Sequence, residues 1–557
     1  MTHPPNWKAR APFPPVGNIT YAQQDSLPTL PVLALQSTLQ KLKASLKPLA
    51  KNAEEYSAAL RKIDAFAAGA GPTLQRRLEA RAAEPGREHW LEEWWDDIAY
   101  MGYRDSVSLL TLLSRKSPLS LLTGCHQRLV LLYVDQYGGP TGTHLSLLST
   151  DGFTPQPAHL DQTPVARAAA LTRSTLFFRQ KLLTGHIPPD STREGALCMD
   201  TWRWMFDACR VPDKPSDWAV TYAKEGDDGV SGHIIALRRG RVWKIPAVVD
   251  GRLISTWELE AQLQHVYDHT NQEYPGVGVL TASNRDVWTN DYQELLKEPQ
   301  NEAIVREIHS SAFVLCLDTE KPEGSIEHSR ALWHGGVKGG QLGNRWNDKP
   351  VQLIVFDNAK AGIMGEHSVM DGTPTARMCD EVLDALLDKS FDHGPSASSN
   401  LAPPQPLDWK LTPKIENAIE KAKVAADELV NGQALGYHLT SYGKAVIKKF
   451  GVSPDSWSQL LVQLAYHRLM GGKPLEGGTY EAATTRRFKK GRTEAIRIVT
   501  EESKAWVKSM DDVSIGPAQR RELFMTAASK HIGDAKEAGK AQGIDRHLLG
   551  TFVRVKF

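Results

Sequence analysis

The sequence has little cysteine and no excess of charge of either sign. Five cysteines stand in 557 residues, none of them in a Cys-x-x-Cys pair. Because the cysteines are few and scattered, we expect neither a disulfide framework nor a thiolate zinc site. The low cysteine content favours a reducing intracellular compartment. The 66 Lys and Arg residues balance 65 Asp and Glu residues, for a net charge of +1. Because nucleic-acid-binding chains usually show a basic excess, we expect a small molecule or a protein as partner, and no nucleic acid.

Long apolar runs are missing as well. No stretch approaches the roughly 18 uncharged apolar residues that span a bilayer, so we expect no transmembrane segment. The composition, 41% hydrophobic and 24% charged, is typical of a globular chain with large cores. Five prolines among the first 15 residues would break an amphipathic targeting helix. We therefore predict that residues 1–26 form a disordered arm.

The apolar spacing predicts a mixed α/β chain. Leucines three and four residues apart predict a helix over 35–46, and residues 53–82 follow the same helical pattern. Ser255 and Glu258 form a capping-box pattern that predicts a helix start. Runs of strand length and composition predict strands over 233–237, 241–245, 277–281, 311–317 and 351–356.

The strongest change of composition lies between residues 390 and 413, where Ser, Pro, Gly and Asn dominate. Such stretches are typical of linkers. Beyond it, Thr412-Pro413 and Ser453-Pro454 each predict the start of a helix. The sequence thus predicts two lobes joined near residue 400.

One short motif has the residues for acid–base chemistry. Residues 366–372 contain His-x-x-x-Asp-Gly, with His367 and Asp371, soon after the strand predicted at 351–356. An imidazole can take a proton from a hydroxyl or thiol near neutral pH, and an acid four residues on could orient its ring. By itself the motif is weak, since most histidines are ordinary surface or core residues.

The context of the motif is more specific. Residues 343–372 closely resemble the signature of the choline/carnitine O-acyltransferase family. Further blocks that resemble the family follow in order near residue 27 and at 94–100, 278–288, 453–466, 479–494 and 545–550.

This resemblance implies an α/β fold of two domains, each like chloramphenicol acetyltransferase, with mixed sheets, flanking helices and an active-site tunnel at their interface. Residues 27–88 would be N-terminal helices packing on the C-terminal domain. Residues 89–400 would form the N-terminal acyltransferase domain and residues 401–557 the C-terminal one. On this pattern His367 would be the general base and Asp371 its acidic companion.

The same resemblance implies coenzyme A or acyl-CoA as co-substrate, with no permanently bound cofactor and no metal. Lys444 and Lys448 match the family's lysines that meet the phosphates of coenzyme A, and Asp455 lies near its pantetheine or adenine end. Two ammonium groups at helical spacing suit a phosphate clamp. An ordinary solvated helix face is the alternative.

The acyl acceptor is indicated by three further matching positions, Tyr480, Thr493 and Arg546. Choline acetyltransferases have Val and Asn in place of the last two, and carnitine has a carboxylate that choline lacks. An arginine can bind that carboxylate, so the resemblance favours carnitine. The alternative for Arg546 is a surface ion pair with Asp545 or Glu537.

Aromatic residues of the N-terminal region also match the family. We interpret Trp94, Trp95 and Tyr100 as core packing rather than as catalytic residues.

The resemblance ends near the C-terminus. Family members continue beyond the block at 545–550, through a Ser-Thr-Ser motif that helps to stabilise the oxyanion and to bind carnitine, and this sequence contains no Ser-Thr-Ser run. The resemblance therefore predicts that the C-terminal domain is truncated.

The expected function is that of a monomeric carnitine O-acyltransferase, which transfers short acyl groups reversibly between coenzyme A and the carnitine hydroxyl. One alternative is a truncated, inactive relative that only binds coenzyme A or a protein partner. Another is an acyltransferase that uses a different alcohol, such as choline. The sequence does not distinguish mitochondria, peroxisomes and cytosol as the location.

Overall fold

The computed structural model describes residues 4, 6–13, 17–106, 156–336, 340–396, 401–432, 440–472 and 478–556. Its largest sheet has six strands in the order β11-β10-β9-β5-β6-β12. Strand β9 runs parallel to both of its neighbours, and the other pairs are antiparallel. The strands are β5 (His233–Arg238), β6 (Arg241–Pro246), β9 (Val314–Asp318), β10 (Val351–Phe356), β11 (Ala361–Gly365) and β12 (Gln405–Leu407).

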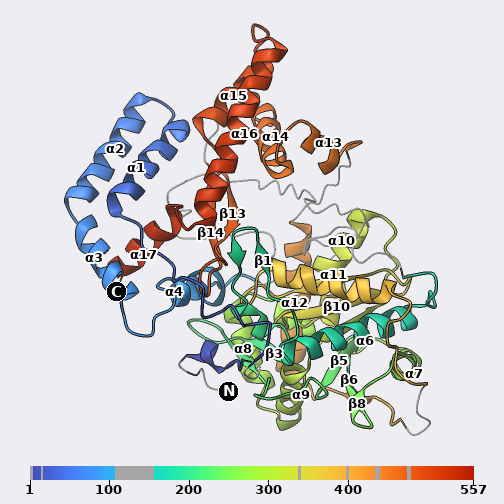
Figure 1. The fold of residues 1–557 in the computed structure, drawn as a ribbon. Coiled ribbons are helices and arrows are strands. Elements are labelled where there is room, and N and C mark those ends of the chain that lie inside the picture. The colour runs from blue at the N-terminus through green and yellow to red at the C-terminus, as the bar shows by residue number, and fades with distance from the viewer. Residues whose placement is uncertain are drawn as a thin grey trace.

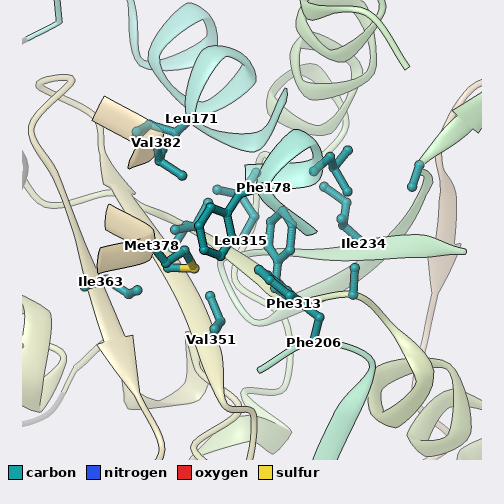
Figure 2. Packing of buried hydrophobic residues seen from close by; sticks show 14 of the residues in the cluster. Leu171, Phe178, Phe206, Ile234, Phe313, Leu315, Val351, Ile363, Met378 and Val382 are labelled. Atoms are coloured by element: carbon teal, nitrogen blue, oxygen red, sulfur yellow. The ribbon is translucent and has the colours of Figure 1, made fainter. Parts of the chain in front are cut away.

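One face of this sheet is covered by α6 (Pro164–Leu183), α7 (Thr256–Asp268) and α11 (Gly372–Leu387). Phe178 and Met378 from these helices pack with Leu315 of β9, as Figure 2 shows.

The opposite face is covered by α8 (Arg285–Leu295), α9 (Pro299–Ser310), α10 (Ser325–His334) and α12 (Pro413–Asn431). Here Cys316, the residue after Leu315, packs with Trp288. Successive strand residues point to opposite faces, and both faces are buried, which explains the uninterrupted apolar runs of β9 and β10.

The C-terminal part contains a helical group that projects away from this sheet in Figure 1. The group packs around Trp506 and Leu460, and its helices are α13 (Lys444–Lys449), α14 (Pro454–Leu469), α15 (Glu501–Asp511) and α16 (Pro517–Gly539). Strands β13 (Tyr480–Thr484) and β14 (Thr493–Arg497) form an antiparallel pair beneath it.

The N-terminal helices contact this C-terminal part. Helix α17 (Asp545–Lys556) packs against α3 (Gly71–Ala82). The Thr38 hydroxyl lies 2.7 Å from His547 Nδ1, and Lys504 donates a hydrogen bond to the Pro48 carbonyl. The other N-terminal helices are α1 (Leu35–Leu46), α2 (Ala53–Ala68) and α4 (Glu92–Asp96), which continues as a π-helical turn η3 (Asp97–Met101).

The remaining elements are short. They are the strand pairs β1 (Ser191–Thr192) with β2 (Gly195–Ala196), β3 (Ala208–Val211) with β4 (Trp218–Thr221), and β7 (Val248–Val249) with β8 (Arg252–Leu253), and the 3-10 turns η1 (Trp7–Arg10), η2 (Lys47–Leu49), η5 (Asp200–Trp204), η6 (Val277–Ala282) and η8 (Leu342–Asn344).

Most predicted elements are confirmed, including the capping box at Ser255. The strand predicted over 277–281 is wrong, because this segment is the 3-10 turn η6. A Cβ on Gly278 would lie 2.0 Å from the Arg345 carbonyl oxygen. The backbones approach so closely that the segment coils locally, and Thr281 donates its hydroxyl to the Gly278 carbonyl.

The described residues of the N-terminal arm make ordered contacts with the rest of the protein, in contrast to the disorder that we predict for residues 1–26. Ala11 is buried, and the Ile19 N–H donates to the Gly185 carbonyl at 2.9 Å. Trp7 packs edge to face on Trp204. These contacts need no helix, so the prolines do not oppose them.

The segment after the predicted linker also contacts the large sheet. Strand β12 pairs with β6, and α12 packs on the same face as α8. The domain boundary near residue 400 stays a prediction.

In the parts of the chain that the structure describes, no helix is both long and apolar enough to cross a membrane. Four described cysteines are free and buried, and Cys125 lies outside the described residues.

Candidate active site

His367 lies in the loop between β11 and α11, the segment that carries the His-x-x-x-Asp-Gly motif. Its side chain is 51% exposed. Its neighbours Glu366, Ser368, Val369 and Met370 are buried. The buried neighbours thus hold the backbone of the loop in place, and the imidazole of His367 stays accessible to a ligand. The resemblance implied a tunnel, and in this structure the ring is half exposed.

The protonation of the ring follows from its hydrogen bond. Nδ1 lies 3.0 Å from the Met370 carbonyl oxygen, which can only accept. Nδ1 therefore carries the proton of the neutral ring, and Nε2 keeps a lone pair. The Tyr100 ring lies 5.3 Å from the imidazole, centroid to centroid. A neutral His367 can thus act as a base through Nε2.

Asp371 does not hydrogen-bond to the ring, since its Oδ1 lies 3.8 Å from Nδ1. It stands at the N-cap position of α11 but makes no capping bond there. Its carboxylate instead accepts two hydrogen bonds from Arg492, at 2.9 and 3.0 Å. Burial alone would raise the pKa of Asp371, but Arg492 and then His367 outweigh it and the pKa is lowered. A negative charge is therefore held beside His367.

Arg492 is the residue that sequence reasoning missed. Besides Asp371, it donates to the carbonyls of His367 and Ser368 and to Asp96 Oδ1, each at 3.2 Å. Its guanidinium lies over the Tyr100 ring at 4.5 Å. The signal that could have found it is its place directly before Thr493, within a block already matched to the family.

A second set of contacts holds the other side of the loop. Glu366 accepts hydrogen bonds from the Ser368 N–H and hydroxyl and from Arg210 Nη1, the last at 3.0 Å. Arg210 also donates to Asp217 and to the Tyr100 carbonyl. The His367 loop is thus clamped by two buried arginines from different parts of the chain.

Thr493 and Arg546 lie in contact, and their part in substrate binding stays a prediction. Arg546 Nη2 lies 3.2 Å from the Thr493 hydroxyl, and Nε donates to the Thr493 carbonyl at 2.9 Å. The guanidinium stacks on the Trp95 ring at 3.8 Å. Trp95 and Tyr100 therefore contact site arginines, a role beyond the core packing we expected.

The alternative of a surface ion pair for Arg546 is wrong. Asp545 binds Arg497 instead, and Glu537 lies near Lys41. Arg546 is only 8% exposed and forms no ion pair with any residue that the structure describes. The carboxyl group on which its charge acts is that of Glu494, with no ion pair between the two side chains.

A small pocket adjoins these residues. Its lining includes Trp95, Arg492, Thr493, Glu494 and Arg546. Burial raises the pKa of Glu494 to about 7, although Arg546 acts to lower it. The pocket thus borders both Arg492, which holds Asp371, and Arg546, which contacts Thr493.

Tyr480 lies apart from this group. It begins β13, 68% exposed, and pairs with Arg497, whereas Thr493 lies opposite Thr484 at the other end of the strand pair. The described geometry does not bring Tyr480 to Arg546.

Lys444 and Lys448 lie one turn apart on α13, as their spacing predicts. Neither forms an ion pair with a described residue. Asp455 is in the first turn of α14, which packs against α13. Within the described part of the chain, the two ammonium groups thus have no carboxylate partner, and their role in binding coenzyme A stays a prediction.

Asp455 also lies near Glu481 and His531, with possible ligand atoms within 4.8 Å of one another. His531 is already bonded on both sides, by Ser456 at Nδ1 and by Glu481 at Nε2. The cluster is therefore explained by contacts within the protein.

The chain is similar over most of its length to a known protein family and to several of its members. The family model described as Choline/Carnitine o-acyltransferase matches residues 30–556. The chain is 31% identical over 543 residues to a peroxisomal carnitine O-octanoyltransferase of Bos taurus, covering 96% of this chain and 82% of the relative. It is 30% identical over 550 residues to the mitochondrial carnitine O-acetyltransferase of Saccharomyces cerevisiae, covering 96% of this chain and 74% of the relative. It is also 30% identical to the carnitine O-acetyltransferase of Homo sapiens, covering 95% of this chain and 79% of the relative.

The match runs from residue 30 to residue 556, and the chain covers between 74% and 82% of the lengths of these relatives. The truncation of the C-terminal domain stays a prediction. Because the family model spans nearly the whole sequence, the chain belongs to the choline/carnitine O-acyltransferase family.

Proposed function

We propose that this protein is a carnitine O-acyltransferase that moves short acyl groups reversibly between coenzyme A and the hydroxyl of carnitine. The observation that carries the proposal is the hydrogen bond from His367 Nδ1 to the Met370 carbonyl, which leaves Nε2 as a base on a half-exposed ring. Family membership supplies the reaction class.

His367 is the general base of this reaction. As the carnitine oxygen attacks the thioester carbonyl, its proton passes to Nε2 and a carbon–oxygen bond forms. When the carbon–sulfur bond breaks, the imidazolium returns the proton to the sulfur of coenzyme A. The same groups run the reverse reaction, so no net proton is gained or lost.

Asp371 supports this cycle by its charge rather than by a hydrogen bond. Its carboxylate, 3.8 Å from Nδ1, favours the imidazolium that forms during transfer. Arg492 keeps that carboxylate in place and ionised.

Arg546 and Thr493 bind the carboxylate of carnitine. Arg546 is buried and forms no ion pair with a described carboxylate, and an anionic substrate would supply one. This charge favours carnitine over choline. The part of Tyr480 in carnitine binding rests on the resemblance alone.

Lys444, Lys448 and Asp455 bind coenzyme A, with the two lysines on its phosphates. Their support is the helical spacing on α13 and the absence of ion pairs between these lysines and other described residues.

The test uses purified protein with acetyl-CoA and L-carnitine, and follows the release of free thiol. His367→Ala should lose about 10²–10⁴-fold in kcat, the usual contribution of a general base. His186→Ala, which removes an exposed histidine, should keep the wild-type rate. The proposal fails if His367→Ala keeps its turnover, or if the wild type releases no thiol with acetyl-CoA or butyryl-CoA.

A further inference from the structure

The N-terminal turn η1 reaches the active-site loop through a chain of buried charges. Lys8 Nζ lies 2.8 Å from Glu92 Oε1 and 2.5 Å from Asp96 Oδ2. The other oxygen of Asp96, Oδ1, accepts a hydrogen bond from Arg492 at 3.2 Å. The carboxylate of Asp96 therefore bridges a cation of the N-terminal arm and the arginine that holds Asp371.

An apolar contact joins the same two segments independently. Ala11 is buried in a cluster that contains Met101 and Val369, and Trp7 packs against this cluster. Val369 lies between His367 and Asp371 in the active-site loop. The arm and the loop thus share a small core.

The charges in this chain lie in a dry environment. The side chains of Lys8, Asp96 and Arg492 are 17%, 7% and 3% exposed. Charges interact more strongly where water is excluded, and removing one partner leaves the other uncompensated. Burial would lower the pKa of Lys8, but Asp96 and Glu92 outweigh it and the pKa is raised, so its charge persists.

We propose that Lys8 is a positioning residue of the active site, which keeps Arg492 on Asp371 by neutralising half of the Asp96 carboxylate. Without Lys8, the full negative charge of Asp96 would attract the Arg492 guanidinium. This attraction would weaken the two hydrogen bonds from Arg492 to Asp371. The base His367 and its charged neighbour would then lose their fixed geometry. This inference rests on the proposed function, because one of its readouts is turnover.

The main variant is Lys8→Met, compared with Lys8→Arg. The matched control is Arg10→Met, which removes an exposed cation from the same turn. Misplacement of a catalytic group from a distance can cost about 100-fold. We expect Lys8→Met to lower kcat by about 10- to 100-fold with little change in the KM for acetyl-CoA. Lys8→Arg should keep most of the activity, and Arg10→Met all of it.

A second variant separates positioning from simple loss of structure. In the double variant Lys8→Met with Asp96→Asn, the uncompensated carboxylate is gone. We expect it to be more active than Lys8→Met alone. The proposal is overturned if the effects of the two substitutions on kcat are additive. It is also overturned if Lys8→Met has the same kcat as Arg10→Met.

A readout without catalysis keeps this test distinct from that of the proposed function. Hydrogen exchange of the backbone amides of residues 366–372 should be faster in Lys8→Met than in Arg10→Met, whatever the substrate proves to be. Equal exchange in the two variants would overturn the role of Lys8. Absent turnover of the wild type with carnitine, together with faster exchange in Lys8→Met, would overturn only the proposed function.

Discussion

The Arg492 guanidinium donates two hydrogen bonds to the Asp371 carboxylate, with N–O distances of 2.9 and 3.0 Å. They are 121 residues apart in sequence. Asp371 is the N-cap residue of α11, which covers the large sheet, and Arg492 precedes β14 of the C-terminal part. The geometry around His367 therefore depends on how these two parts of the chain pack.

Replacing Arg492 by Met should harm both stability and turnover. Breaking a buried ion pair by removal of one partner costs about 3–5 kcal/mol in the free energy of unfolding. It also releases two carbonyls of the His367 loop, so we expect kcat to fall by about 100-fold. Urea unfolding and the thiol assay measure the two effects. Arg487→Met, which removes a half-buried arginine paired with Glu194, is the control. Wild-type behaviour of Arg492→Met would contradict the role of these two hydrogen bonds.

Arg546→Met should act on the acceptor substrate only. A charged hydrogen bond is worth about 1.5–3 kcal/mol, so the KM for carnitine should rise by about 10- to 150-fold. The KM for acetyl-CoA should change little. Arg497→Met, which removes the neighbouring arginine that pairs with Asp545, is the comparison. An unchanged KM for carnitine, or a wild type that prefers choline, would rule out this role for Arg546.

Loss of both Lys444 and Lys448 should weaken the binding of coenzyme A. Two exposed charge contacts are together worth up to about 30-fold in affinity, and salt screens them. We expect the double Met variant to have a higher KM for acetyl-CoA and a weaker salt dependence of that KM. Lys423→Met, an exposed lysine of α12 that pairs with Glu420, should show neither change. Equal values for the two variants would favour the solvated helix face.

Glu494 should make stability depend on pH. Burial raises its pKa to about 7, whereas a glutamate of the unfolded chain titrates near its usual value of about 4.3. Between these values the folded protein binds the extra proton, so the free energy of unfolding falls as pH rises from about 4 to about 7.

Glu494→Gln removes this effect while keeping an oxygen that accepts the Arg546 N–H. The variant should match the wild type below pH 4 and exceed its free energy of unfolding by about 3 kcal/mol at pH 8. Denaturant unfolding at pH 4, 6 and 8 measures the difference. Glu522→Gln on the exposed side of α16 is the control. A difference that does not change with pH would contradict the prediction.

The fold was predictable where its signals are local. The leucine spacing of α1, the capping box of α7 and the apolar runs of β9 and β10 each depend on neighbours within one element. The prediction for 277–281 was wrong because the close approach of Gly278 to Arg345, a contact between distant segments, sets its conformation.

The site was predictable in part. The motif and the family resemblance selected His367, Asp371, Thr493 and Arg546, and the structure brings these into two adjoining pairs. Their functional roles stay predictions. Arg492 lies in a block that resembles the family, but the local pattern gave no reason to select it, because its contacts are with Asp371 and Asp96 in other elements.

By itself, the sequence determined the family of this protein, most of its helices and strands, and the loop that carries its candidate base. Only the tertiary structure decided that Asp371 binds Arg492 rather than the imidazole, that Arg546 contacts Thr493 and forms no ion pair within the described residues, and that Lys8 joins the same network as Arg492. The physical reason is that the spacing of residues along the sequence determines on which face of a helix or strand a side chain lies. Which charge it meets there is set by packing between segments far apart in the chain.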